Sequence, residues 1–223
     1  MGRSLKIWMS FAASALLLSS APALLADGVA GANVLQNPGF EDWSVASGLG
    51  DPPALTNAGL VPTNWVASPE DQAPKDNPGT FTGGIYKDAS VKHGGNASLR
   101  LESGRSVDII GVTQEASVDP NSKYEIDAWY KGDGIAANGD TGVFVWAVYG
   151  PVADYWSHMT FNSNKPPVHD GTFDWTPFQM TFDTNDTAGK VRLTLQLRLA
   201  SGKVWFDDVV LKKLGTVTPV KSY

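Results

Sequence analysis

The sequence predicts an all-β domain, a β-sandwich or jelly roll of about eight to ten antiparallel strands. Several stretches alternate apolar and polar residues with the period of a strand, and none has a convincing helical period. Turns rich in Gly, Pro, Asn and Asp separate these stretches, and the chain of 223 residues contains 23 Gly and 14 Pro. A chain of this length and pattern fits one sandwich or barrel domain.

The clearest strand covers residues 191–199. Its apolar side carries Val191, Leu193, Leu195, Leu197 and Leu199, and its polar side carries Arg192, Thr194, Gln196 and Arg198. This alternation is typical of a strand with one buried and one polar side. Residues 200–203 (Ala-Ser-Gly-Lys) have the composition of a turn, and residues 204–211 follow as a second strand. We therefore predict a β-hairpin here.

The remaining strands are shorter. We predict strands over residues 97–102, 109–118, 124–131, 143–149 and 173–182. Segment 131–142 is rich in Gly and Asp and is predicted to be a loop. Pro177 favours an edge strand or a bulge, because proline cannot donate to a central ladder. Segment 42–82 is rich in Pro, Gly, Asn and Asp, which predicts a long system of surface loops.

Residues 1–26 have the composition of a signal peptide. Arg3 and Lys6 make its positive start, residues 7–18 are apolar, and small residues at 21–23 and 24–26 offer cleavage sites. The alternative is a membrane anchor, but the apolar run is short and interrupted by serines. The predicted organisation is a signal peptide (1–26), a linker (27–32), one β-sandwich domain (33–214) and a C-terminal tail (215–223).

Composition narrows the function classes. The net charge is −6 and no basic stripe is present, which argues against nucleic acid as a partner. After the signal peptide, no apolar stretch approaches the length of a membrane-spanning helix. The chain has no cysteine, so a disulfide framework is excluded. In an exported protein this favours a bacterial origin, an extracellular or periplasmic location, and calcium as a structural staple.

Six segments, taken in order, resemble carbohydrate-binding modules of the cellulase-associated type, families four, nine, sixteen and twenty-two. They are NPGFE (37–41), PTNW (62–65), HGGNASLRL (93–101), VTQEASVDPNSKYEIDAWYKGD (112–133), FDWTPF (173–178) and VWFDDVVL (204–211). The resemblance covers about residues 33–213, although segment 42–82 is longer than usual and no catalytic domain is attached. It implies a galactose-binding-like jelly roll that binds a polysaccharide.

A calcium site is predicted where the two ends of the domain meet. Calcium takes six to eight oxygen ligands, from carboxylates and backbone carbonyls. The resemblance implies that the first and last strands are neighbours, so that the Gly39 carbonyl, Glu41 and Asp207 supply ligands. The alternative is surface carboxylates and an ion pair with Lys or Arg. Asp207 and Asp208 point to opposite faces of a strand, so they do not form a catalytic pair that flanks one glycosidic bond.

A sugar site is predicted on the polar side of the sheet. Sugars are recognised by flat aromatic rings and by planar hydrogen-bonding groups. If their strands are neighbours, one face combines Trp129, Trp146, Gln196 and Arg198, the last two from the polar side of strand 191–199. The alternative is that both tryptophans belong to the core.

Two further aromatic residues, Tyr155 and Trp156, are candidates for the rim of a binding groove. The nearby His158 is interpreted as structural, because the three histidines of the chain lack the spacing of a metal site or a Ser/His/Asp triad.

The sequence thus predicts a secreted, non-catalytic carbohydrate-binding module with a structural calcium. Its expected partner is a polysaccharide or oligosaccharide; a separate glycan-active enzyme as a second partner and the oligomeric state are left open. Two other functions remain open at this point. One is a small secreted polysaccharide-degrading enzyme, although no convincing catalytic constellation is present. The other is a cell-surface structural or interaction protein that has lost its sugar site.

Overall fold

A computed structural model describes residues 31–45, 60–67, 83–151, 160–164 and 169–219. These residues form ten β-strands and no helix, which confirms the predicted all-β class. The strands are β1 (Trp43–Val45), β2 (Leu60–Pro62), β3 (Val66–Ala67), β4 (Gly84–Asp88), β5 (Ser98–Ser103), β6 (Ile109–Ser117), β7 (Ser122–Gly150), β8 (Thr160–Asn164), β9 (Gly171–Asp183) and β10 (Lys190–Thr216). No helix of this described part is long and apolar enough to span a membrane.

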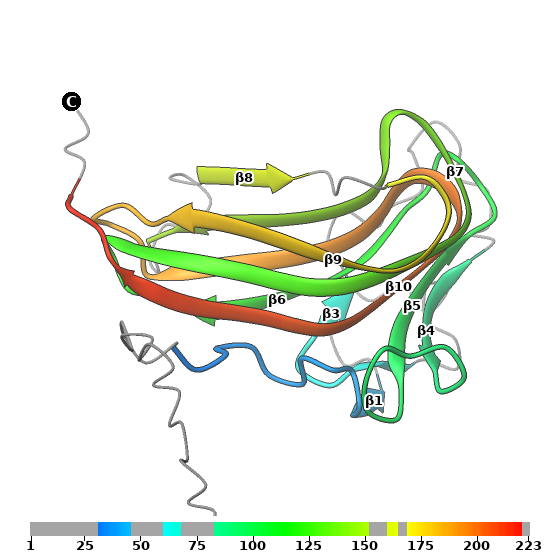
Figure 1. The fold of residues 1–223 in the computed structure, drawn as a ribbon, viewed down its shortest axis with the longest axis horizontal. Coiled ribbons are helices and arrows are strands. Elements are labelled where there is room, and N and C mark those ends of the chain that lie inside the picture. Colours follow the sequence, from blue (N-terminus) through cyan, green and yellow to red (C-terminus); the bar gives the residue numbers. More distant parts are fainter. Residues whose placement is uncertain (1–30, 46–59, 68–82, 152–159, 165–168, 220–223) are drawn as a thin grey trace, which may run out of the picture.

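Two long strands, β7 with 29 residues and β10 with 27, organise the molecule. They pair antiparallel over almost their whole length, from Lys190 opposite Gly150 to Thr216 opposite Ser122. Both bend near the middle and return, so each contributes one half to each of two layers (Figure 1).

The bend divides the strands into two layers. The first layer contains β4, β5, residues 202–216 of β10, residues 122–133 of β7, and β9. The second layer contains β3, β6, residues 190–198 of β10, residues 142–150 of β7, and β8. In the described residues β9 pairs only with β7, so the prediction of an edge strand around Pro177 is confirmed.

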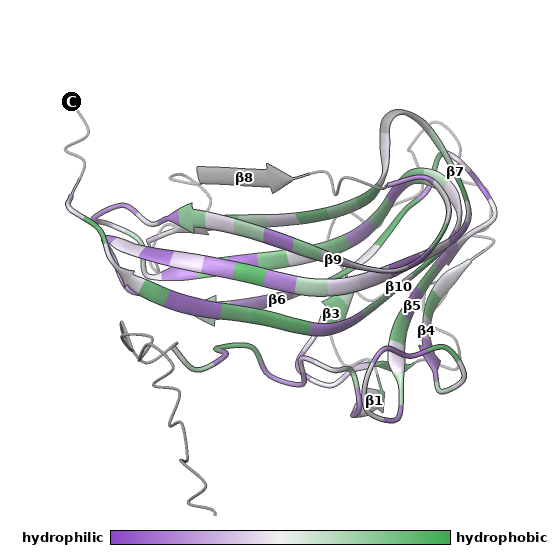
Figure 2. Ribbon diagram, viewed as in Figure 1, coloured by the Kyte–Doolittle hydropathy of each residue, from purple (hydrophilic) through white to green (hydrophobic). Residues whose placement is uncertain are grey.

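The core lies between the layers, because each strand turns one row of apolar side chains inward. In the second layer Leu193, Leu195 and Leu197 are fully buried, and in the first layer Phe206 and Leu211 are fully buried. The Tyr149 ring of the second layer stacks on the Phe182 ring of the first layer at 5.8 Å. Figure 2 shows the alternation of apolar and polar residues along β9 and β10 that produces this arrangement.

The prediction of a C-terminal hairpin is wrong, and so is the prediction of a loop at 131–142. Residues 200–203 continue β10, and its two halves both pair with β7 rather than with each other. The register shifts between Arg198 and Ala200 and again between Ser201 and Lys203. Leu199 and Gly202 have φ angles of 46° and 114°, so the turn-forming residues bend a continuous strand.

The N-terminal segment runs beside the last strand. The Val34 amide donates to the Leu211 carbonyl at 2.9 Å, and the Val209 amide donates to the Pro38 carbonyl at 3.0 Å. Phe40 and Trp65 bury their rings together, with centroids 5.2 Å apart. The hydrogen bonds to Val209 and Leu211 place the segment that contains Glu41 beside β10 near Asp207.

Candidate functional site

The outer face of the second layer carries aromatic and polar side chains, which we call the second-layer face: Phe144, Trp146, Thr194, Gln196 and Arg198. Trp146 lies opposite Thr194, and Phe144 lies opposite Gln196. Their neighbours in sequence, including Val143, Val145 and Leu195, are fully buried in the core. Phe144 and Trp146 are therefore successive outward positions of one strand, and both are partly exposed.

Gln196 lies on the predicted face but beneath its surface. Its side chain is fully buried, whereas Arg198, two residues along, is partly exposed. A Cβ atom at the facing Gly111 would lie 2.5 Å from Gln196 Cγ, so the side chain occupies the space that this glycine leaves open. Gln196 thus forms part of the floor of the second-layer face, while Arg198 reaches solvent.

Trp129 does not join Trp146, so the prediction of one surface containing both tryptophans is wrong. Trp129 belongs to the first layer, where it lies opposite Asp207 on one side and Pro177 on the other. The reason is the bend of β7, which places the two halves of the strand in different layers, with outer faces pointing in opposite directions. Trp129 instead stacks on the His93 ring, with centroids 4.1 Å apart and planes 14° apart.

Tyr155 and Trp156, the candidate rim residues, lie outside the described residues, as does His158.

The three predicted calcium ligands converge at the junction of the N-terminal segment and β10. A Cβ atom at Gly39 would lie 3.9 Å from Asp207 Oδ1 and 3.9 Å from Glu41 Cγ. The Glu41 carboxylate accepts hydrogen bonds from the Asn96 amide at 2.9 and 3.0 Å. Gly95 has a φ of 51°, and a side chain there would overlap Glu41 Oε1. The glycines of loop 93–96 therefore allow the carboxylates to approach the backbone closely.

Asp207 is a fully buried carboxylate held by backbone N–H groups. Its Oδ2 accepts from the His93 and Gly94 amides at 2.8 and 3.0 Å, and its Oδ1 accepts from the Asp208 amide at 2.8 Å. Burial raises the pKa of Asp207, and the charge of Asp208 adds to this, while the backbone hydrogen bonds act in the opposite direction. A cation beside Asp207 would compensate the cost of keeping this carboxylate ionised.

The donor set at this junction fits calcium better than a transition metal. No group of three or more His, Cys, Asp or Glu side chains is arranged as metal ligands within the described ranges. Two carboxylates do not complete a calcium coordination shell, so a calcium ion held by Glu41 and Asp207 would need further oxygen ligands, such as backbone carbonyls or water.

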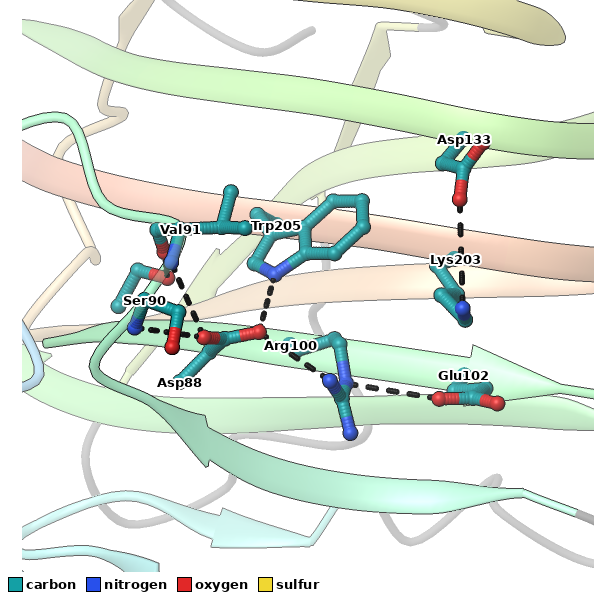
Figure 3. Close-up of polar contacts among 9 residues, drawn as sticks. Asp88, Ser90, Val91, Arg100, Glu102, Asp133, Lys203 and Trp205 are labelled. Atoms are coloured by element: carbon teal, nitrogen blue, oxygen red, sulfur yellow. Dashed lines mark hydrogen bonds and ion pairs between the residues drawn. The ribbon is translucent and has the colours of Figure 1, made fainter.

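A network around Asp88 lies on the outer face of the first layer, and sequence analysis did not identify it (Figure 3). The Trp205 indole Nε1 donates to Asp88 Oδ2 at 2.9 Å, and Arg100 Nη1 donates to the same oxygen at 3.1 Å. The Arg100 guanidinium also lies 4.5 Å from the centroid of the Tyr86 ring. Trp205 is only 5% exposed although it points away from the core. In the sequence, the signal for this network was Trp205 beside Phe206, because strand alternation turns one of the two outward. The sequence did not reveal the partner, Asp88, which is 117 residues away.

No protein-family model and no curated protein sequence matches the chain. Among solved structures, a family 4 carbohydrate-binding module is similar over 80% of this chain and 98% of its own, with 17% identity and a TM-score of 0.50. The CBM22-1 xylan-binding domain of Paenibacillus barcinonensis Xyn10C is similar over 84% and 98%, with 15% identity and a TM-score of 0.49.

The enzymatically active domain of bacteriophage CBA120 tailspike protein 4 is similar over 81% of this chain and only 21% of its own, with 10% identity and a TM-score of 0.49. The chain thus spans about a fifth of that phage protein. The likeness to the family 4 module confirms at the level of the fold the resemblance inferred from the sequence, a carbohydrate-binding-module type of β-sandwich.

Proposed function

We propose that this protein is a non-catalytic carbohydrate-binding module and that the second-layer face binds the sugar. The observation that carries the proposal is the pair Phe144 and Trp146, two partly exposed aromatic side chains at successive outward positions of one strand. Arg198, a partly exposed residue, lies on the neighbouring strand of the same face. The β-sandwich fold, similar to that of a family 4 carbohydrate-binding module, supports the same function.

The chemistry of this face suits a saccharide. Aromatic rings contact the apolar faces of pyranose rings, and the planar fork of arginine forms paired hydrogen bonds with oxygen acceptors. The buried Thr194 and Gln196 make the floor, and a floor of fixed side chains reduces the entropy lost on binding. The site would therefore bind its sugar in a preformed state, with no covalent step.

The carboxylates of the junction support a non-catalytic role. A glycosidase needs two carboxyl groups on either side of one bond, about 5 to 10 Å apart. Asp207 is fully buried and occupied by three backbone N–H groups, and Asp208 Oδ2 lies 2.7 Å from His93 Nδ1. Asp207 therefore serves the packing of loop 93–96, and it cannot act with the adjacent Asp208 as a pair that flanks one glycosidic bond.

The binding experiment compares two arginines of one strand face. Arg198 belongs to the second-layer face, whereas Arg192 pairs with Glu115 through contacts of 2.6 and 3.1 Å. Affinity electrophoresis in gels with soluble xylan, mixed-linkage β-glucan or β-1,4-galactan should show retardation of the wild type, reduced by Arg198→Ala and kept by Arg192→Ala. Trp146→Ala should weaken binding by about 2 kcal/mol, or about 30-fold in Kd. Equal retardation of all folded variants would contradict the assignment of this face.

Calcium is proposed as a structural ion at the junction, with the Gly39 carbonyl, Glu41 and Asp207 as ligands. Its support is the convergence of these groups and the burial of Asp207. There the ion would neutralise the buried charge and tie the N-terminal segment to β10.

Export is proposed from residues 1–26, and the proposed partner is an extracellular polysaccharide. N-terminal sequencing of the exported protein should find a start near Ala26 or Asp27. A start at Met1 or Gly2 on exported protein would contradict cleavage.

A further inference from the structure

A cavity of about 530 Å³ opens on the outer face of the first layer, on the other side of the molecule from the second-layer face. It lies between β9, β7 and β10, and its volume falls within the range of small-molecule sites, about 300 to 1,000 Å³. The side chains that define it are Asp127, Trp129, Pro177, Gln179, Asp208 and Val210.

Trp129 is the partly exposed aromatic side chain in the wall of the cavity. Trp129 stacks on His93, and the His93 ring meets the edge of the Trp175 ring at 5.6 Å. Pro177 and Val210 add apolar surface, so one side of a ligand would meet flat or apolar groups. This combination is the one that a pyranose ring requires on its less polar face.

The polar groups of the cavity are the carboxylates of Asp127 and Asp208, which already have hydrogen-bond partners, and the side-chain amide of Gln179. Asp127 accepts from Lys212 Nζ at 3.0 Å and from Gln179 Nε2 at 3.1 Å. Asp208 Oδ2 lies 2.7 Å from His93 Nδ1. A carboxylate with one or two partners retains lone pairs for further donors, and the amide oxygen of Gln179 is an acceptor as well. The polar groups can therefore accept hydrogen bonds from a hydroxyl-rich ligand.

The wall is held in place before any ligand arrives. The His93 and Gly94 amides donate to Asp207, and the Asn96 amide donates to Glu41. These contacts fix the loop that carries His93 against β10 at Asp207, so the stacked pair with Trp129 is preorganised.

We propose that this cavity is a second carbohydrate-binding site, which accepts a neutral sugar unit between Trp129 and the row Asp127–Gln179. The proposal rests on the proposed function, because it assumes that the protein binds saccharides. The two sites would lie on the outer faces of opposite layers. One molecule would then hold two polysaccharide chains at once and cross-link them, instead of holding one chain at two points.

Isothermal titration of the full chain with cellohexaose, laminarihexaose and xylohexaose tests the proposal through stoichiometry. The expected result is two sites per molecule for the wild type and one site for Trp129→Ala and for Trp146→Ala, with the affinity of the remaining site unchanged. Circular dichroism and thermal melting establish that each variant is folded.

A milder pair of variants covers the case in which Trp129→Ala does not fold. Gln179 lines the cavity, and Thr181 is the next outward residue of the same strand, equally exposed but outside the cavity. Gln179→Ala should weaken only the first-layer site, several-fold or more, and Thr181→Ala should leave both sites unchanged.

The outcomes separate the two proposals. One site that is lost with Trp146→Ala and unaffected by Trp129→Ala and Gln179→Ala overturns the second site and leaves the proposed function intact. One site that is lost only with the first-layer variants supports the cavity and overturns the assignment of the second-layer face. Absence of binding to every oligosaccharide overturns both. With two sites, the wild type should also raise the light scattering of soluble xylan or β-glucan, and the single-site variants should not.

Discussion

The two layers are built from the same pair of strands, yet their outer faces differ in chemistry. Outward ion pairs occur on both layers, as in Lys212 with Glu125 at 2.7 Å on the first and Arg192 with Glu115 at 2.6 Å on the second. At the centre of the second-layer face, Thr113 and Thr194 are buried with their hydroxyl oxygens 3.2 Å apart. Strand alternation therefore decides which residues point outward, but neighbouring segments decide which of them reach solvent.

Two outward tryptophans make this difference concrete. Trp205 of the first layer is 5% exposed and donates its indole N–H to Asp88, so it acts as part of the fold. Trp146 of the second layer is partly exposed beside Phe144, which is the arrangement expected of a ligand platform. Substituting each of them tests whether one outward position is structural and the other is functional.

The largest expected effect is on stability, from Trp205→Ala. Removing a large buried ring costs about 3 to 5 kcal/mol in the free energy of unfolding. Trp205→Phe should cost about 1 to 3 kcal/mol, because it keeps most of the ring volume but leaves the buried Asp88 oxygen with one hydrogen bond fewer. Chemical denaturation measures both values, and sugar affinity at the second-layer face should be unchanged wherever the variants are folded.

Trp146→Ala is the matched variant on the other layer, with a smaller loss of stability and a clear loss of affinity. If Trp146→Ala destabilised the fold as much as Trp205→Ala and left affinity unchanged, the two tryptophans would have the same structural role and the contrast between the layers would fail.

The next effect concerns calcium, which should act on the first layer and leave the second unchanged. An ion that binds only the native state stabilises it by about 2.7 kcal/mol at a hundredfold excess over its Kd. Chelation should therefore lower the melting temperature without abolishing the β signature, and Asp207→Ala should remove the calcium-dependent increment. Identical melting curves with and without chelator would contradict the calcium site. If chelation also lowered sugar affinity at the second-layer face, the effect of calcium would not be confined to the first layer.

The strands could be predicted because a period of two residues is a local property. Segments 191–199 and 204–211 were both recognised as strands, with the apolar row of the first correctly assigned to the core except at Leu199, which has a positive φ of 46° and is partly exposed. The connection between them could not be predicted, because Ala-Ser-Gly-Lys suits a turn as well as a bend. What decides between the two is the continuous partner strand β7, which pairs on both sides of these residues.

The candidate sites differ in how much of them the sequence could predict. Gly39, Glu41 and Asp207 were grouped through a sequence resemblance and lie near one another, and their role as calcium ligands stays a prediction. Trp129 and Trp146 belong to one strand, β7, but lie on either side of its bend between residues 132 and 142. The pairing with β10 reveals this bend, whereas the sequence does not, so the sequence could not show that the two side chains lie on different layers. Gln196 was assigned to the correct face, but its burial depends on Gly111 and other segments that its own alternation does not describe.

The smallest expected effect is the pH dependence contributed by Asp88. Burial opposes ionisation of this carboxyl, but the hydrogen bonds from Trp205, Val91 and Ser90 and the charge of Arg100 together outweigh it, so its pKa is lowered from 3.8. A carboxyl with a lowered folded-state pKa adds stability that is fully present above its unfolded-state pKa. That stability is lost as the pH falls through the folded-state pKa.

Asp88→Asn should therefore lower the free energy of unfolding at neutral pH. In acid this difference should disappear, because wild-type Asp88 is then protonated and neutral, like asparagine. The free-energy difference between the two proteins, measured by denaturation from about pH 2 to pH 7, isolates this carboxyl because the other groups titrate in both. Glu115→Gln is the matched variant on the second layer, where Lys190 and Arg192 also lower a carboxyl pKa against the effect of burial. Glu115 is exposed, so its pH-dependent contribution should be the smaller of the two. A difference for Asp88→Asn that is constant over the whole pH range would mean that the Trp205–Asp88 contact stabilises through packing, and that the charge of Asp88 has no part in the distinction between the two layers.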